Sequence, residues 1–404
     1  MVRGDGIGLR VARWRDLAGL TQQQLGDTVG VSGAYISMIE NGRRAVTKRS
    51  LLHDLAAALG VGVDQLTGQP YEPRSRADLV VSALAAGLRT AIDEDPAEGA
   101  PPVPAAELAR DVQRLSYART ACDFDTMLAL GPRLVAQSRP LAEAGVPAGL
   151  AAHARAAGDM GMVIKSYGYA DLAVHLADAA RASALRLGDP GHLAAADVAV
   201  AQCAYAADSV RRSLRVSTVG ADAAGDGPGD RTLSLYGMLR LQAALCAAVT
   251  GRTSDVDGHL AEAESAAARV TSDPWLHELT PTNVDIWRVY IAVENGEPER
   301  APEFARRIDP TRIRSLERRV ALHLDTGRGC YAAGQHRQAL RRFLAADDLA
   351  PLKVRHRSVV HEIVRQMLRD ARRGGPAELR ELAVRLSLDP VSPDHEPATD
   401  ITTS

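Results

Sequence analysis

The first 68 residues carry apolar residues in several short runs at helical spacing, each closed by a glycine or a polar cap. The first run ends before Gly19, a second lies in 20–30, a third in 32–40 and a fourth in 48–60. A last turn ends near Gly68. The candidate core positions of the first, third and fourth runs are Leu9, Val11, Trp14, Leu17, Ile36, Ile39, Leu51, Leu52, Leu55 and Leu59. This pattern predicts a small domain of five short helices.

Local capping signals mark the ends of the two middle helices. Thr21, with Gln24 three residues later, forms a capping box in which each side chain satisfies a free backbone N–H group. Gly30 can adopt the positive φ that ends this helix, and Ser32 is a natural cap for the next one. Two short helices joined at a glycine in this way predict a helix-turn-helix.

From residue 76 onward the chain reads as alanine-rich helices separated by glycine-containing turns. The clearest unit is 321–351, where five residues fall at the spacing of a tetratricopeptide repeat: Gly327, Ala339, Phe343, Ala346 and Pro351. Small residues at such positions let two antiparallel helices approach closely, and stacked pairs bury a continuous core. The pattern therefore predicts a degenerate α-solenoid.

These patterns divide the chain into four parts. We expect an all-α protein with a five-helix helix-turn-helix domain at 1–68, a linker at 69–75 and a tetratricopeptide-like solenoid at 76–390. A polar tail is expected at 391–404. Pro70 and Pro73 place the boundary between the two domains.

Positive charge is concentrated in the first domain. The 404-residue chain has a formal net charge of -2, so it has no overall positive field that would attract nucleic acid. Residues 1–50, however, hold eight basic side chains against four acidic ones. Lysine occurs only at Lys48, Lys165 and Lys353. Any DNA-binding surface is therefore expected within the first domain.

Other classes of protein find little support in the sequence. The four cysteines are isolated, which argues against disulfides and a zinc site. We expect a cytoplasmic protein, because the N-terminus has no apolar leader. The most apolar run, 192–207, is mostly alanine and contains Asp197, so no membrane span is expected. No cofactor, metal site or enzymatic activity is expected, because the eleven histidines do not cluster at ligand spacing and no nucleophile elbow is present.

The order of specific residues in the first domain gives a family resemblance. The residues that carry it are Gly19, Thr21, Gln22, Leu25, Gly30, Val31, Ser32, Ile36, Ser37, Ile39, Glu40 and Gly42. With them, 13–66 resembles the Cro-like, xenobiotic-response-element class of bacterial regulators. The resemblance implies that 32–40 is a recognition helix in the major groove of DNA. It also implies an ion pair between Arg15 and Glu40 that braces the first helix against the recognition helix.

The residues expected to contact DNA follow from this placement: Gln22, Gln23, Ser32, Gly33, Ala34, Tyr35, Ser37, Met38, Arg43, Arg44 and Lys48. Arg49 is a further candidate for a phosphate contact. Gln22 opens the helix before the recognition helix, where its amide and free backbone N–H groups can bind a phosphate.

The outer face of the expected recognition helix is unusually small. At 100° per residue its outward positions are Gly33, Ala34, Ser37 and Met38. Neither Gly33 nor Ala34 can hydrogen-bond a base through its side chain, although the Ala34 methyl can touch a thymine methyl. Backbone approach, Ser37, Tyr35 and DNA shape must then supply much of the specificity.

Two helical stripes in the second domain are candidates for effector binding. One consists of Tyr236 and Arg240, and the other of Asn283, Trp287 and Tyr290. On the concave surface of a solenoid, an asparagine could hold a peptide backbone and an arginine a carboxylate. The alternative interpretation is that both stripes are interhelical packing with buried polar pairs.

The two domains together resemble one-component regulators that join a Cro-like head to a tetratricopeptide-like sensor, including peptide-sensing quorum regulators of Gram-positive bacteria. The resemblance implies a homodimer that binds a double-stranded DNA operator and responds to a peptide or small-molecule effector. An alternative is an adaptor whose solenoid docks a protein partner while the head localises it to DNA.

Overall fold

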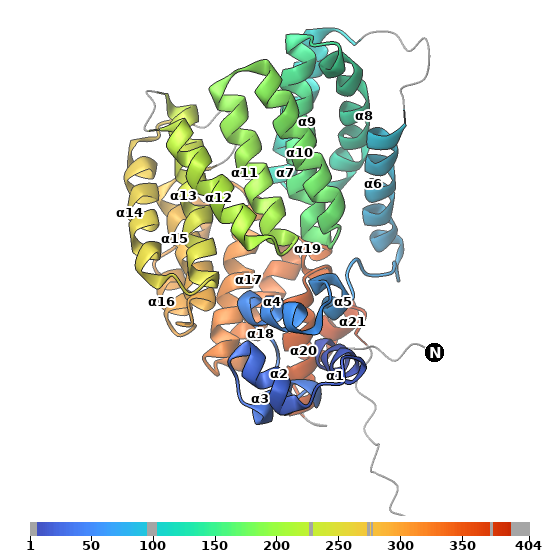
Figure 1. The fold of residues 1–404 in the computed structure, drawn as a ribbon, viewed down its shortest axis with the longest axis vertical. Helices are drawn as coiled ribbons and strands as arrows, with labels where there is room; N and C mark the ends of the chain where they lie inside the picture. The colour runs from blue at the N-terminus through green and yellow to red at the C-terminus, as the bar shows by residue number, and fades with distance from the viewer. Residues whose placement is uncertain are drawn as a thin grey trace, which may run out of the picture.

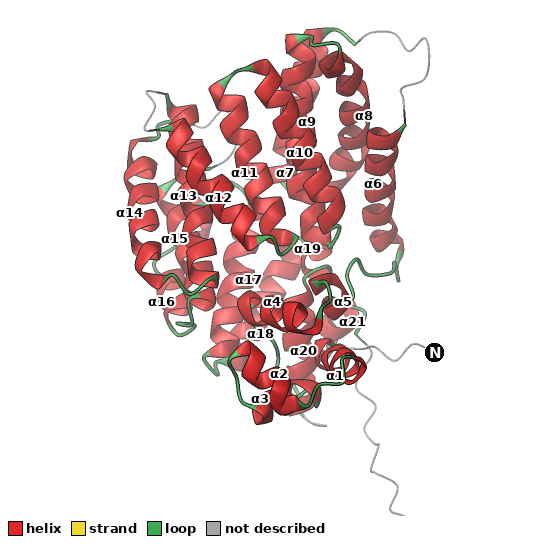
Figure 2. Cartoon of the chain, viewed as in Figure 1, coloured by secondary structure: helices red, strands yellow, loops and turns green. Residues whose placement is uncertain are grey.

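The computed structural model describes residues 6–94, 103–225, 229–272, 275, 278–371 and 375–388. These residues form α-helices and short 3-10 helices, without a strand among them, which confirms the all-α prediction (Figure 2). The polar tail predicted at 391–404 lies outside the described residues.

Residues 6–68, here called the head, fold into five short helices as the pattern predicted. They are α1 (Ile7–Leu17), α2 (Gln22–Val29), α3 (Gly33–Glu40), α4 (Arg49–Leu59) and α5 (Val63–Thr67). Their buried side chains form a separate apolar core around Val11, Leu25, Ile36 and Leu55. The head therefore has the apolar interior that a small helical domain needs.

The predicted caps are present in the head. Thr21 Oγ1 accepts a hydrogen bond from the Gln24 backbone N at 3.1 Å, and Gln24 Oε1 accepts one from the Thr21 backbone N at 2.8 Å. Gly30 ends α2 with a φ of 75°, a conformation that costs glycine little. Ser32 Oγ accepts from the Tyr35 backbone N at 3.1 Å and so starts α3. The helix-turn-helix is thus built from local sequence signals.

Residues 76–388, here called the body, begin with long helices that stand side by side (Figure 1). They are α6 (Arg76–Asp93), α7 (Ala105–Thr120), α8 (Phe124–Glu143), α9 (Pro147–Ile164), α10 (Ala170–Leu187), α11 (Pro190–Ala206), α12 (Val210–Ala224), α13 (Asp230–Val249) and α14 (Thr253–Arg269). The short 3-10 helix η1 (Lys165–Tyr167) lies between α9 and α10. From α7 to α14, each helix packs against the next along the chain, as in a solenoid of helix pairs.

The second part of the body contains shorter helices and the clearest repeat. It comprises α15 (Pro281–Glu294), α16 (Arg300–Arg306), η2 (Pro310–Arg312), α17 (Leu316–Ala332), α18 (His336–Leu349), α19 (Pro351–Arg355), α20 (Ser358–Asp370) and α21 (Ala377–Arg385). A Cβ added at Gly327 would lie 2.5 Å from Phe343 Cε1, so only glycine lets α17 and α18 approach this closely. Phe343, Ala339 and Ala346 are fully buried. This is the packing predicted for a tetratricopeptide-like pair.

The head is docked on the C-terminal helices of the body (Figure 1). Ala45, in the segment after α3, packs into the apolar core that includes Val320 and Phe343. The Ile7 backbone N donates to Glu362 Oε1 at 3.0 Å, and Arg328 Nη2 donates to the Thr47 carbonyl at 2.7 Å. Apolar and polar contacts therefore hold the head in one orientation.

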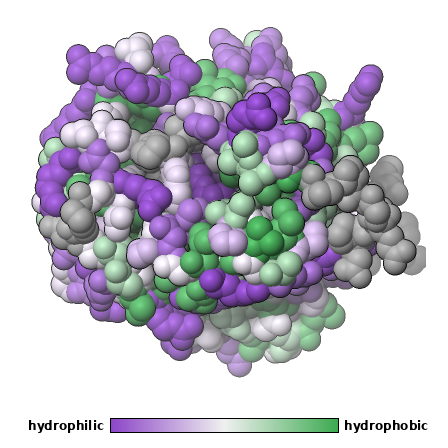
Figure 3. All heavy atoms as spheres, turned by 90° about the horizontal axis from the view of Figure 1, so that it is seen from above, coloured by the Kyte–Doolittle hydropathy of each residue, from purple (hydrophilic) through white to green (hydrophobic). Residues whose placement is uncertain are grey.

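The end of the molecule opposite the head has a mixed surface, in which hydrophilic residues are interspersed with smaller hydrophobic groups (Figure 3). One helix of the described chain, α13, is long and apolar enough to span a membrane. In the structure, 78% of its most apolar stretch is buried against neighbouring helices, and the core helix of a helical body has the same composition.

Candidate nucleic-acid interface

The outer face of α3 stays open to solvent although the head is docked. Ile36 and Ile39 are buried in the core of the head, as their spacing predicted. Ala34 and Met38 are exposed, and Ser37 is half-buried. Side chains on this face can therefore reach the major groove without the head leaving the body.

Gly33 departs from the expectation that it faces outward. It is buried, because α2 crosses close to the first turn of α3. A Cβ at Gly33 would lie 3.0 Å from Gln23 Cα and 2.7 Å from Gln23 Oε1. Glycine is thus required here by the packing of two helices, and a DNA contact at this position could come only from the backbone.

A partly buried ion pair connects α1 to the end of α3. Arg15 Nε donates to Glu40 Oε1 at 2.6 Å, and Arg15 Nη2 donates to Glu40 Oε2 at 3.1 Å. This hydrogen-bonded carboxylate raises the pKa of the Arg15 guanidinium. Gln22 Nε2 also donates to Glu40 Oε2, at 2.6 Å. The expected Arg15–Glu40 pair is present, and it engages the Gln22 amide that was expected to bind phosphate.

Two exposed cations lie just beyond α3. Arg43 and Arg44 are both exposed, and Arg44 Nε donates to the Tyr35 hydroxyl at 3.1 Å. The Arg44 guanidinium also lies 5.0 Å from the centre of the Tyr35 ring. This contact holds the Arg44 guanidinium beside the outer face of α3, which is the arrangement that a backbone phosphate contact would need.

Lys48 and Arg49 do not join these cations. Arg49 Nη2 donates to the carbonyls of Tyr205 and Ala206, at 3.0 and 2.7 Å, and to Asp208 Oδ1 at 2.9 Å. Lys48 lines a cavity between the head and the body. The expectation that these two residues contact phosphates is corrected by this geometry, because the start of α4 is turned toward the body.

The cavity beside Lys48 has a volume of about 550 Å³. Its walls come from α1, the loop before α4, α4, α5 and the segment after α5, and from α6, η1, α10, α11, α13, α15, α17, α19 and α20 of the body. A volume of about 300–1,000 Å³ is usual for a site that encloses a small organic molecule. The head thus supplies one side of this partly open cavity, and the body supplies the other.

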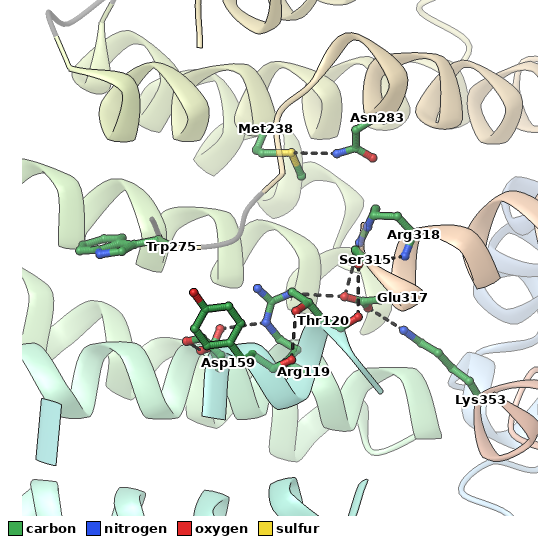
Figure 4. Close-up of polar contacts among 12 residues, drawn as sticks. Arg119, Thr120, Asp159, Met238, Trp275, Asn283, Ser315, Glu317, Arg318 and Lys353 are labelled. Carbon is green, nitrogen blue, oxygen red and sulfur yellow. Dashed lines mark hydrogen bonds and ion pairs between the residues drawn. The ribbon is translucent and has the colours of Figure 1, made fainter. Parts of the chain in front are cut away.

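Charged groups on the cavity wall are mostly paired. Lys353 Nζ donates to Glu317 Oε1 at 2.6 Å, and Arg119 Nη1 donates to Glu317 Oε2 at 3.3 Å (Figure 4). Burial alone would raise the pKa of Glu317, but Lys353, Arg318 and Arg119 hold that pKa far below its usual range. Arg328 pairs in the same way with Glu294, at 2.6 Å.

The two predicted effector stripes do not form one surface. Trp287 and Tyr290 line the cavity. Arg240 instead pairs with Asp222 at 2.9 Å and with Glu262 at 2.5 Å, and the Tyr236 hydroxyl donates to Glu262 at 3.0 Å. These partners lie on α12 and α14, away from the cavity. The stripe containing Tyr236 and Arg240 is therefore interhelical packing, which was the alternative interpretation.

Asn283 is also separate from the cavity wall. It is buried, and its Nδ2 lies 3.7 Å from Met238 Sδ on α13 (Figure 4).

The sequence did not predict that Arg49, Glu294 and Arg328 would join the head to the body. The sequence does contain one signal for the cavity itself: lysine is scarce, and all three lysines of the chain line this cavity.

The capped pair α2–α3, with an exposed outer face and flanking arginines, defines a DNA-binding domain of the helix-turn-helix class. The family model described as a helix-turn-helix domain matches residues 7–67. The N-terminal domain of this chain is therefore a helix-turn-helix domain.

Among solved structures, the crystal structure of ComR from Streptococcus suis is similar to this chain. The match covers 92% of this chain and 97% of that chain, with 14% sequence identity and a TM-score of 0.30. A TM-score this low supports no conclusion about function. No curated protein sequence matches the chain.

Proposed function

We propose that this protein is a transcriptional regulator that binds double-stranded DNA in a sequence-specific manner through α3. The observation that carries the proposal is the accessible outer face of α3, with Ala34 and Met38 exposed beside Arg43 and Arg44. Ala34 and Ser37 are small, so the helix can lie deep in the major groove, and the arginines are placed to hold the phosphates on its rim. A regulator of this kind acts in the cytoplasm, on the nucleoid.

We further propose that it acts as a homodimer. One recognition helix covers only a half-site, and two heads related by a twofold axis read two half-sites about one helical turn of DNA apart. The body is the larger part of each subunit and would supply the contacts between subunits. Sedimentation of the full chain tests this, with a dimer expected and a monomer at all concentrations contradicting it.

The body would also sense an effector. The cavity supports this, because its walls come from both the head and the body. An effector changes DNA affinity only as far as it binds the two states of the protein differently. A molecule enclosed by head and body meets that condition, because it loses part of its contacts when the head moves.

Selection of DNA fragments by the full-length protein tests sequence-specific binding. Genomic fragments bound at physiological salt should share a motif with two half-sites, and the affinity for that motif should exceed non-specific affinity by a factor of about 10³ or more. Arg43→Ala should weaken binding, whereas Arg110→Ala, an exposed cation on α7, serves as the matched control. Retention of DNA without any shared motif would contradict sequence-specific regulation.

A further inference from the structure

All three lysines of this chain line the cavity between head and body, although the other 45 basic residues are arginines. Lys48 comes from the head, Lys165 from the start of η1, and Lys353 from α19. These positions are far apart in sequence, so the fold alone brings them to one cavity. A lysine ammonium is a compact charge on a flexible stem, and its hydrogen bonds can follow a ligand of variable position.

The charges on the cavity wall do not balance. Lys353 is paired with Glu317, Arg49 with Asp208, and Arg328 with Glu294. Within the described part of the chain, the side chains of Lys48, Lys165 and Arg357 line the same cavity without a hydrogen bond or ion pair.

The acidic residues that remain cannot neutralise these cations. Asp64 and Asp171 also line the cavity, but both are exposed to solvent, where water already stabilises their charge. The third, Asp325, is buried, and Arg328 Nη1 already donates to its Oδ1 at 3.2 Å. The cavity wall therefore carries an excess of positive charge.

Lys165 is half-buried at the start of η1. Burial lowers the pKa of its ammonium to about 8. Lys353 and Arg357 lower this pKa further, while Glu317 and the Cys203 thiol oppose them. A half-buried ammonium that lies near two other cations gains stability when an anion joins it. A lysine with a perturbed pKa in a cavity is a candidate for ligand binding.

We propose that this cavity binds a small organic anion, a carboxylate or phosphate monoester, whose charged group accepts hydrogen bonds from Lys165 and Arg357. The remainder of the molecule lies against the aromatic wall of Trp287 and Tyr290. The cavity of about 550 Å³ suits a metabolite of this class. This inference rests on the proposed function, because it names the chemical class of the effector.

Binding would also be coupled to the position of the head. Lys48 and the start of α4 form one wall of the site, so an anion placed near Lys165 is attracted to the head as well. The ligand therefore favours the docked arrangement, and departure of the head exposes the anion to water.

The test uses full-length protein with benzoate and phenyl phosphate as probes, and neutral benzamide as their control. Titration calorimetry should show saturable binding of at least one anion, and little binding of benzamide. Tighter binding of benzoate would identify a carboxylate site, and tighter binding of phenyl phosphate would identify a phosphate site. Equal binding of benzamide, or the lack of saturable binding by both anions, would overturn the proposal.

Substitutions identify the cations responsible. Lys165→Met and Arg357→Met should each weaken anion binding about tenfold or more, because each removes a charge-assisted hydrogen bond. Lys165→Arg should retain binding, and Arg110→Met on α7 is the control. Lys165→Met should also unfold at the same temperature as the parent or a higher one, because it removes an unpaired ammonium. A lower melting temperature with unchanged anion affinity would show that Lys165 is structural.

The pH dependence gives a second signature. Affinity for benzoate should fall as the pH rises above about 8, where Lys165 loses its proton. Lys165→Arg should remove that fall, because arginine remains charged. Specific DNA binding without anion binding refutes only this inference. Anion binding without specific DNA binding refutes only the proposed function.

Discussion

Arg49 is the side chain that ties the head most directly to the body, so its removal should undock the head. Its Nη2 donates to two carbonyls at the end of α11, those of Tyr205 and Ala206, and to Asp208 Oδ1. Its guanidinium also lies 4.9 Å from the centre of the Tyr205 ring. Arg49→Met keeps much of the apolar stem and removes all of these polar contacts.

The loss can be estimated from the contacts. Nη2 carries only two hydrogens, so the three contacts amount to about two charge-assisted hydrogen bonds. Each contributes about 1.5–3 kcal/mol, and the 27% exposure of the Arg49 side chain favours the lower value. The docked state should therefore lose about 3 kcal/mol, which corresponds to roughly a 100-fold increase in undocked protein.

Asp208 limits this loss. Burial already raises the pKa of its carboxyl, and Arg49 opposes the rise. Without Arg49 this pKa increases further, so the carboxyl takes up a proton more readily. We therefore expect undocking with both domains still folded.

Trypsin cleavage after Arg74 reports the undocked population. Arg74 lies in the segment between head and body, and its Nη1 donates to the Ser387 carbonyl at 2.9 Å. Gln69 Nε2 fastens the same segment to the His356 carbonyl at 2.7 Å. Cleavage needs this segment to open, and its rate follows the open population when opening is fast. Arg49→Met should release the fragment 1–74 about 100-fold faster than the parent.

The control is Arg13→Met, on the exposed side of α1, which should leave the rate unchanged. Circular dichroism should give the same helix content for both variants and the parent. A cleavage rate for Arg49→Met within a factor of about two of the parent would refute the reasoning, because it would mean that these contacts contribute less than about 0.5 kcal/mol to docking.

Three further predictions concern the head. Arg43→Ala should weaken binding to every DNA sequence and reduce the slope of log affinity against log salt by about one unit. Ala34→Gln or Ser37→Ala should instead change the preferred base at one or two positions, by about 1–3 kcal/mol. Titrations at several salt concentrations separate these effects, and an unchanged slope would show that Arg43 does not contact a phosphate. Gly33→Ala should destabilise the head by about 1–3 kcal/mol, because its Cβ would lie 3.0 Å from Gln23 Cα; an unchanged melting temperature would count against this packing. A fragment of residues 1–75 should fold alone, because the head has its own core; a disordered spectrum by circular dichroism would place the domain boundary elsewhere.

Most of the head could be predicted because its signals are local. Thr21 with Gln24, Gly30 and Ser32 each act within three or four residues, so the chain order alone determines their contacts. The spacing of Ile36 and Ile39 also identified the buried side of α3. Helical phase did not identify Gly33 as buried, because that depends on how closely α2 crosses α3.

The contacts between head and body could not be predicted in the same way. Arg49 reaches Asp208, which is 159 residues away, and its backbone N donates to Glu294, which is 245 residues away. In the sequence, a basic residue that follows a recognition helix can pair equally well with a DNA phosphate or with a carboxylate of the protein. Only the packed structure decides between the two partners.

The effector stripes show a different limit. Periodicity identifies a buried face only when a helix has one apolar side. In α13 nearly every position from Leu233 to Ala248 is buried, so its sequence does not distinguish a cavity wall from a contact between helices. Arg240 shares its helix face with Tyr236, yet both are held by acidic residues of neighbouring helices. The repeat at Gly327 and Phe343 was predictable because a small residue facing a large one leaves a distinct spacing.

Because the cavity lies between the head and the body, binding of the proposed effector is thermodynamically coupled to docking of the head. Lys48 and Arg49 are adjacent in sequence and both line the cavity, and Arg49 also fastens the head to the body. A ligand that is enclosed by both parts binds the docked state more tightly than the undocked state. Such coupling is reciprocal. The factor by which the ligand favours the docked head over the undocked head is also the factor by which undocking lowers the affinity for the ligand. The outer face of α3 is accessible in the docked state, so a ligand in this cavity would not need to uncover the DNA-binding surface. It would instead fix the orientation of the head relative to the body, and in a dimer that orientation sets the distance between the two recognition helices.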